Sequence, residues 1–138
     1  MKGFESFAEW EATLPSFVTA DALWQFATYQ QALFLADLAW FDCATLQNDF
    51  RGKAIAAQLI RSAGSIAANI EEGYGRGFGK DYARFLSIAL GSARETRGWY
   101  YRSRFVLSES VVQHRTTLLN KIISGLVTAI RHHNHRKL

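Results

Sequence analysis

The side chains that could carry out chemistry are few, and their spacing does not bring an acid, a base and a nucleophile together. Glu71 and Glu72 are neighbours in the sequence, so on a helix they would point in different directions and make a poor acid–base pair. The single cysteine, Cys43, lies in an apolar and aromatic run, which is typical of a buried thiol rather than a nucleophile. The chain has no Glu-x-x-His pair of the kind that holds iron in helical bundles. We therefore predict that the protein is not an enzyme and has no catalytic residue and no cofactor.

Two further segments have some features of a ligand site. His132 and His135 could share a helix face and bind a metal, but they stand in a basic C-terminal run, where solvated histidines are the favoured interpretation. The segment Gly73–Lys80 is rich in glycine and precedes a predicted helix, an arrangement that can hold phosphate. A nucleotide-binding loop follows a strand and ends in Gly-Lys-Ser or Gly-Lys-Thr, and neither condition is met here. We therefore predict no metal, and a turn that exposes Arg76 and Lys80.

Charge is distributed unevenly along the 138 residues, whose formal net charge is +4. Residues 1–50 contain one base and seven acids, whereas residues 51–138 contain fifteen bases and five acids. Such asymmetry indicates a polyanionic partner. The alternative is that the acidic first helix packs beside basic neighbours. No apolar run approaches the roughly 20 residues of a membrane span, and the N-terminus lacks a signal-peptide pattern, so we expect a cytoplasmic protein without a membrane partner.

Hydrophobic side chains recur at helical spacing in one short and four long segments. The predicted helices span residues 6–13, 21–46, 52–72, 80–107, and from Ser108 or Ser110 to 133. Because the links between the long helices are short, neighbouring helices must run antiparallel. The sequence therefore predicts an all-α fold, an up-down-up-down antiparallel four-helix bundle with a short extra N-terminal helical segment. Its parts would be an acidic, aromatic extension at 1–18, the bundle at 19–133 and a basic tail at 134–138.

Two details of the long helices are also predicted. One face of the first long helix should carry the core residues, namely Leu23, Ala27, Gln30, Phe34, Leu38 and Phe41. The second long helix should end at Gly73, because glycine is common just after the last helical residue.

The second long helix has an apolar stripe, a small-residue face and a polar stripe. The polar stripe consists of Gln58, Arg61, Ser65, Asn69 and Glu72. A helix of this kind is surrounded on most sides, so its polar side chains need partners, which the third helix can supply through residues such as Glu95. We therefore predict a structural polar motif of Arg61, Ser65, Asn69, Glu72 and Glu95. We expect Asn69 and Glu72 to be buried and hydrogen-bonded, inside the bundle or at a subunit contact.

Small residues predict an oligomer contact. Gly91 and Gly98 lie two turns apart on one face of the third helix. Glycine inside a helix costs about 1 kcal/mol relative to alanine, so close approach of another helix should compensate. Together with the small face of the second helix, the predicted oligomer contact comprises Gly64, Ala68, Gly91 and Gly98.

Two stretches resemble the hallmark of a known family. They are residues 58–76, with the sequence QLIRSAGSIAANIEEGYGR, and residues 85–93, with the sequence FLSIALGSA, followed by Glu95. They are similar to the four-helix bundle protein family, which includes proteins encoded in intervening sequences of bacterial 23S ribosomal RNA genes. It also includes the accessory variability determinant of diversity-generating retroelements. The resemblance covers roughly residues 20–130, and two positions depart from the pattern. Ala67 stands where the family often has a proline, and the serine or threonine that the family often has near Gly79 is missing.

This resemblance implies a four-helix bundle that assembles as a homopentamer and, in the retroelement branch, a nucleic-acid-binding partner of a reverse transcriptase. Together with the basic half, it leads us to predict a non-enzymatic, homo-oligomeric accessory protein that binds RNA or DNA, with no small-molecule substrate. The residues expected to contact phosphates are Arg76, Lys80, Arg84, Arg94, Arg97, Arg102 and Arg104. No base-reading motif is present, so little sequence specificity is expected. The alternative is a protein–protein adaptor, or an orphan bundle with no nucleic-acid role.

Overall fold

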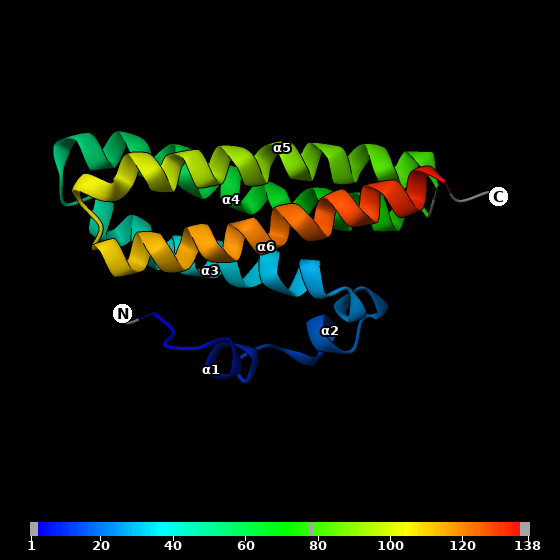
Figure 1. Cartoon of the computed structure of the whole chain (residues 1–138). Coiled ribbons are helices and arrows are strands. Elements are labelled where there is room, and N and C mark those ends of the chain that lie inside the picture. Colours follow the sequence, from blue (N-terminus) through cyan, green and yellow to red (C-terminus); the bar gives the residue numbers. More distant parts are fainter. Residues whose placement is uncertain (1–2, 78, 136–138) are drawn as a thin grey trace.

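The computed structural model describes residues 3–77 and 79–135. Four long helices make up the bundle: α3 (Ala27–Leu46), α4 (Phe50–Gly75), α5 (Lys80–Arg102) and α6 (Glu109–Asn134). Successive helices run antiparallel and lie side by side, as Figure 1 shows. The predicted all-α four-helix bundle is therefore confirmed. No helix within the described residues is long and apolar enough to cross a membrane.

Side-chain caps define where several helices begin. The Asp49 carboxylate accepts hydrogen bonds from the backbone N–H groups of Gly52 and Arg51, which start α4 and also lower the pKa of Asp49. Ser108, rather than Ser110, caps α6, because its hydroxyl oxygen accepts from the backbone N–H of Val111. Short links with strong caps fix the antiparallel order of the helices.

Three helix boundaries differ from the sequence prediction. The first long helix is broken at the extended residue Phe26, because Asp21 caps a separate 3-10 turn, η1 (Ala22–Gln25), before α3 begins. The third long helix, α5, ends at Arg102, and a separate 3-10 turn, η2 (Ser103–Phe105), follows it. Gly73 does not end the second helix: it lies inside α4, where a Cβ would stand 2.7 Å from the Cβ of Phe85. This glycine is needed for packing against α5, not for termination.

The N-terminal segment covers the outer side of α3. It contains α1 (Phe7–Glu11) and α2 (Ser16–Thr19), which lie on the far side of α3 from α5 in Figure 1. Trp10 is fully buried, and its indole Nε1 donates to the Asp37 carboxylate at 2.8 Å. The rings of Phe7 and Phe34 meet edge to face, with centroids 5.5 Å apart. The extension therefore shares a hydrophobic core with the bundle.

The single core face predicted for the first long helix is confirmed only in part, since Leu23, Phe34 and Leu38 are buried but other buried residues lie off that face. Ala27 is exposed, whereas Asp42 and Cys43 are buried. Cys43 faces α4, where its thiol donates to the carbonyl oxygen of Ala56 at 3.4 Å, while Phe34 faces α1. Because α3 is covered by the bundle on one side and by the N-terminal segment on another, apolar residues occur nearly all round it and blur the helical period.

Candidate nucleic-acid interface

The seven predicted phosphate-contacting residues form two groups at opposite ends of the bundle. Because α4 and α5 are antiparallel, the residues that end α4 and begin α5 lie together at one end (Figure 1). This first group consists of Arg76, Lys80 and Arg84. The second group lies toward the other end, where α4 begins and α5 ends, and consists of Arg94, Arg97, Arg102 and Arg104. A single continuous patch of all seven is therefore not formed within one chain.

The first group is balanced by acids. Arg76 pairs with Glu72 at 3.1 Å, and Arg84 pairs with Asp81 at 3.5 Å. Both guanidinium groups also lie over the ring of Phe85, at 5.4 and 4.4 Å from its centroid. Residues 62–93 contain three bases and three acids, so this stretch of α4 and α5 carries no net charge.

The second group lies in a strongly positive region, which we call the basic end. It comprises residues 50–61 of α4 and residues 94–105 of α5 and η2, and it contains seven bases and one acid. The bases are Arg51, Lys53, Arg61, Arg94, Arg97, Arg102 and Arg104. The one acid, Glu95, is already paired with Arg61 at 2.7 Å. Arg51 pairs with Asp49, just before this region, at 3.6 Å. The other five bases form no ion pair within the described part of the chain.

The four arginines of the second group are not paired with the acidic first half of the same chain. Arg97 is half-buried and donates to the side-chain oxygen of Asn120 at 2.8 Å. Arg94, Arg102 and Arg104 are exposed, and no ion pair of theirs is present within the described part of the chain. The alternative in which acidic residues of the first helix neutralise these arginines is therefore wrong within one chain.

A polar seam runs between α4 and α5, with the partners that the sequence placed on the third helix. Glu95 accepts from Arg61 at 2.7 Å and from the indole of Trp99 at 3.0 Å. Further along, the hydroxyls of Ser65 and Ser92 are 2.9 Å apart. Ser62 and Thr96 are fully buried in the same seam, and the Thr96 hydroxyl donates to the Ser62 hydroxyl oxygen. The seam joins the two helices that carry the basic end and holds them in register.

Two members of the predicted polar motif are less buried than expected. Asn69 is half-buried and donates back to Ser65 on its own helix, at 2.9 and 3.0 Å. Glu72 is exposed and pairs with Arg76 one turn later. The expectation that Glu72 is buried inside the bundle is wrong, because its side chain points to solvent near the end of α4. Burial of either residue at a subunit contact stays a prediction.

The glycines predicted for oligomer contact are not covered by the chain itself. Apart from the adjacent residues and the backbone of their own helix, no described atom lies within 4 Å of a Cβ built on Gly64 or Gly91, and Ala68 is exposed. At Gly98 the neighbour is the flexible guanidinium group of Arg102. Close helix approach within the chain occurs instead at Gly73 and at Gly125, where the side chain of Thr28 packs directly against the glycine backbone of α6.

A buried ionic network was not anticipated from the sequence. Arg115 on α6 donates to both carboxylate oxygens of Asp42, at 2.8 and 3.0 Å, and Tyr100 donates to Asp42 at 2.7 Å. Burial and the neighbouring Asp42 raise the pKa of the Tyr100 hydroxyl. The signal that could have revealed the network is the lone aspartate within the apolar run of residues 38–43. The network joins α3, α5 and α6 and leaves the charge of Asp42 satisfied.

The thiol of Cys43, next to this network, has low nucleophilic reactivity. Cys43 is buried, as the sequence predicted. Burial, with a smaller effect of Asp42, raises the pKa of the thiol to about 11. A thiolate is therefore scarce near neutral pH, which agrees with a structural role.

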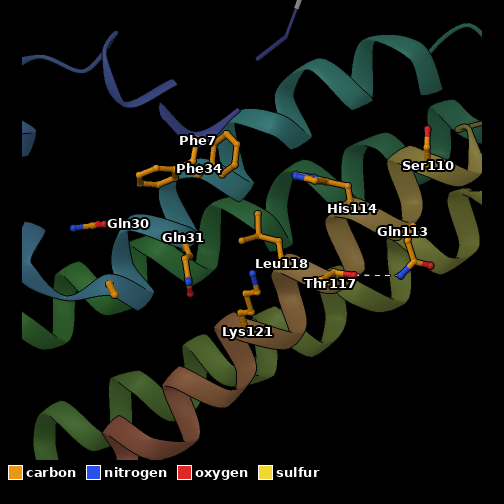
Figure 2. A pocket seen from close by; sticks show the side chains of 11 residues that line it. Phe7, Gln30, Gln31, Phe34, Ser110, Gln113, His114, Thr117, Leu118 and Lys121 are labelled. Atoms are coloured by element: carbon orange, nitrogen blue, oxygen red, sulfur yellow. Dashed lines mark hydrogen bonds between the residues drawn. The ribbon is translucent and has the colours of Figure 1, made fainter. Parts of the chain in front are cut away.

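A pocket of about 630 Å³ lies between the N-terminal segment, α3 and α6. Figure 2 shows Phe7 and Phe34 side by side in its wall, with Leu118 and Lys121 contributed by α6. The imidazole of His114 also lines it, and burial together with the adjacent Arg115 lowers the pKa of His114. Among the described residues no carboxylate lines this pocket to orient the imidazole, so the lining residues do not form a hydrolytic triad.

The other candidate ligand segments offer no assembled site. Among residues 3–77 and 79–135, no group of three His, Cys, Asp or Glu side chains could hold a metal ion. In the glycine-rich segment, Gly77 and Gly79 adopt positive φ angles of 107° and 76°, as a tight turn requires. Arg76 and Lys80 beside them are exposed, as predicted for such a turn. Residues 136–138 of the predicted basic tail, and Phe78 of this turn, lie outside the described residues.

The fold places the protein in the class of all-α four-helix bundles, here with one strongly basic end. Comparison with known sequences identifies its family. Residues 25–127 match the family model described as the 23S rRNA-intervening sequence protein. The chain belongs to this family. No curated protein sequence matches the chain significantly.

A solved structure has the same fold. It is described as a protein with unknown function from the S23 ribosomal protein family from Bacteroides thetaiotaomicron VPI-5482. The two share 24% sequence identity and a TM-score of 0.69, over 75% of this chain and 98% of the other. At this identity the likeness supports the fold alone. The family match begins at residue 25, so it does not include the N-terminal segment.

Proposed function

We propose that the protein is a non-enzymatic accessory protein that binds nucleic acid, RNA foremost, through phosphate contacts at the basic end. The observation that carries this proposal is the ratio of seven bases to one acid over residues 50–61 and 94–105. Phosphate backbones are recognised mainly by such clustered cations. Membership of a family named for an intervening sequence of ribosomal RNA supports RNA as the partner.

The proposed assembly is a homo-oligomer, a homopentamer by resemblance, with the exposed small residues of α4 and α5 at the subunit contacts. Gly64 and Gly91 are exposed, and a Cβ added at either position would meet open space. Exposed isoleucines flank them, with Ile60 38% and Ile88 44% exposed. An oligomer would present several basic ends to one polyanion, so that modest affinity at each site would become avidity.

The test compares two charge-matched triple variants. Arg94, Arg102 and Arg104 are replaced by glutamine in one variant, and Arg76, Lys80 and Arg84 in the other. Binding to a labelled RNA is measured by fluorescence anisotropy over a range of salt concentrations. The log–log salt slope should fall by about 0.7 to 0.9 for each phosphate that the variant no longer neutralises. The slope of the first variant should therefore be smaller by about 2 to 3, and its binding to all sequences should weaken equally.

The second variant is the control, because its cations lie in a region without net charge. It should keep nearly the full affinity and salt slope of the native protein. Absence of salt-dependent RNA binding in the native protein would contradict the proposal. Equal losses of affinity in the two variants would show that the basic end is not the site. Unchanged binding in both, with capture of an acidic partner protein, would favour the adaptor function instead.

A further inference from the structure

We infer that the basic end binds unpaired nucleic acid by stacking bases on exposed aromatic rings, an inference that rests on the proposed function and specifies its substrate. Three aromatic residues of this end are open to solvent: Phe50 is 93%, Phe105 80% and Tyr101 59% exposed. Phe50 begins α4, and the other two stand at the end of α5 and in η2, so all three lie at the same end of the bundle (Figure 1).

Arg104 organises two of these rings. Its guanidinium carbon lies 4.0 Å from the ring centroid of Tyr101 and 4.2 Å from that of Phe105. The same group donates to the backbone carbonyl oxygen of Tyr101 at 3.0 Å, which holds it in place. A neighbouring pair repeats this arrangement, with the guanidinium of Arg102 5.1 Å from the indole of Trp99. Aromatic and cationic groups therefore alternate along this end.

This combination fits unpaired nucleotides better than the other polyanions. In a duplex the bases stack on one another and their faces are closed, so a duplex would use the arginines and leave the rings exposed. In a single strand the base faces are free, and aromatic side chains surrounded by cations are the usual platform for them. Two copies of this chain would not associate through their basic ends, because the seven bases of one copy would repel the seven bases of the other.

The test uses three probes of equal length, about twelve nucleotides: an unstructured single-stranded RNA, an abasic strand with the same phosphates, and an RNA duplex. Binding to the full-length protein is measured by fluorescence anisotropy. The single strand should bind more tightly than the abasic strand, because the abasic strand offers charge without stacking. Phe105→Ser should weaken binding of the single strand about 5- to 100-fold and leave the abasic strand unchanged.

Matched controls are available elsewhere on the chain. Phe17 on α2 is also 80% exposed but lies outside the basic end, so Phe17→Ser should not change any affinity. Arg84 also lies over a phenyl ring, that of Phe85, but belongs to the balanced end. Arg104→Gln should therefore weaken single-strand binding, and Arg84→Gln should not. Thermal melting of each variant verifies that the surface substitutions leave the fold intact.

The outcomes separate this inference from the proposed function. If the single strand, abasic strand and duplex bind equally and Phe105→Ser has no effect, phosphate binding stands and base stacking is refuted. If no probe binds, the proposed function and the inference both fail. If Phe105→Ser lowers the mass measured by light scattering while RNA affinity is unchanged, the aromatic rings are a self-association surface, and the inference is overturned.

Discussion

Arg115 on α6 donates two hydrogen bonds to the carboxylate of Asp42 on α3, from Nε at 2.8 Å and from Nη2 at 3.0 Å. The two residues are 73 positions apart in the sequence. Both side chains are almost fully buried, at 13% and 8% exposed. Burial alone would lower the pKa of Arg115, but the bonds to Asp42 outweigh it and raise that pKa. The pair therefore joins α3 and α6, the first and last long helices of the bundle, through a buried ion pair.

Removing one partner of this pair should be strongly destabilising. Asp42→Ala leaves the Arg115 charge buried without a counter-ion, so the free energy of unfolding should fall by about 3–5 kcal/mol in urea denaturation. The control is Asp81→Ala, which removes an exposed ion pair 3.5 Å long and should cost less than about 1 kcal/mol. Equal decreases in the two variants would show that Asp42 contributes no more than a surface carboxylate.

The N-terminal segment should contribute to the free energy of unfolding as a core helix does. Trp10→Ala removes a fully buried indole and its hydrogen bond to Asp37, and should lower stability by about 3–5 kcal/mol. Phe17→Ala, in the same segment but 80% exposed, should have little effect. Thermal melting of the two variants measures the difference. If Trp10→Ala melts like the native protein, the segment is an appendage rather than part of the core.

These two sites show what could be predicted from sequence. The bundle follows from helical periodicity and short links, because those signals are local. The role of Asp42 depends on Tyr100 and Arg115, which are distant in sequence, and no local pattern pairs them. Four of the seven bases of the basic end were predicted to contact phosphate, but Arg51 and Lys53 were missed and Arg61 was assigned only to the polar motif. The division into a balanced and an unbalanced stretch became visible only once α4 and α5 were antiparallel. The burial of Trp10 could not be anticipated, since the extension has no period of its own.

Stability should fall as the pH drops below neutrality, in part because of His114. Burial, and then the charge of Arg115, lowers the pKa of His114 below its ordinary value of 6.5. The unfolded chain therefore binds a proton more readily than the folded one, so the stabilising contribution is complete above pH 6.5. It disappears as the pH falls from 6.5 to the folded pKa. His114→Gln should flatten this part of the stability profile in urea titrations from neutral to mildly acidic pH; an unaltered profile would refute the assignment.

The exposed glycines give a prediction that separates folding from assembly. Gly64 and Gly91 are in helix interiors, and no other helix or side chain of the described residues, adjacent residues aside, lies within 4 Å of a Cβ added at either. Gly91→Ala should therefore stabilise the isolated fold by up to about 1 kcal/mol through helix propensity alone. Gly73→Ala is the control, because its Cβ would stand 2.7 Å from Phe85 Cβ and 2.9 Å from the Tyr82 ring, so it should destabilise the fold.

Larger side chains at the same positions test the proposed subunit contact. Gly64→Leu and Gly91→Leu find open space in the single chain, so far-ultraviolet circular dichroism should show full helicity. If the small-residue face is an interface, the added leucines overfill it, and the mass measured by light scattering should fall towards that of the 15.6 kDa monomer. A native protein that is already monomeric at micromolar concentration would contradict the oligomer. If the native protein is an oligomer and both leucine variants keep its mass, the subunit contact does not lie on α4 and α5, because no helix could approach closely there.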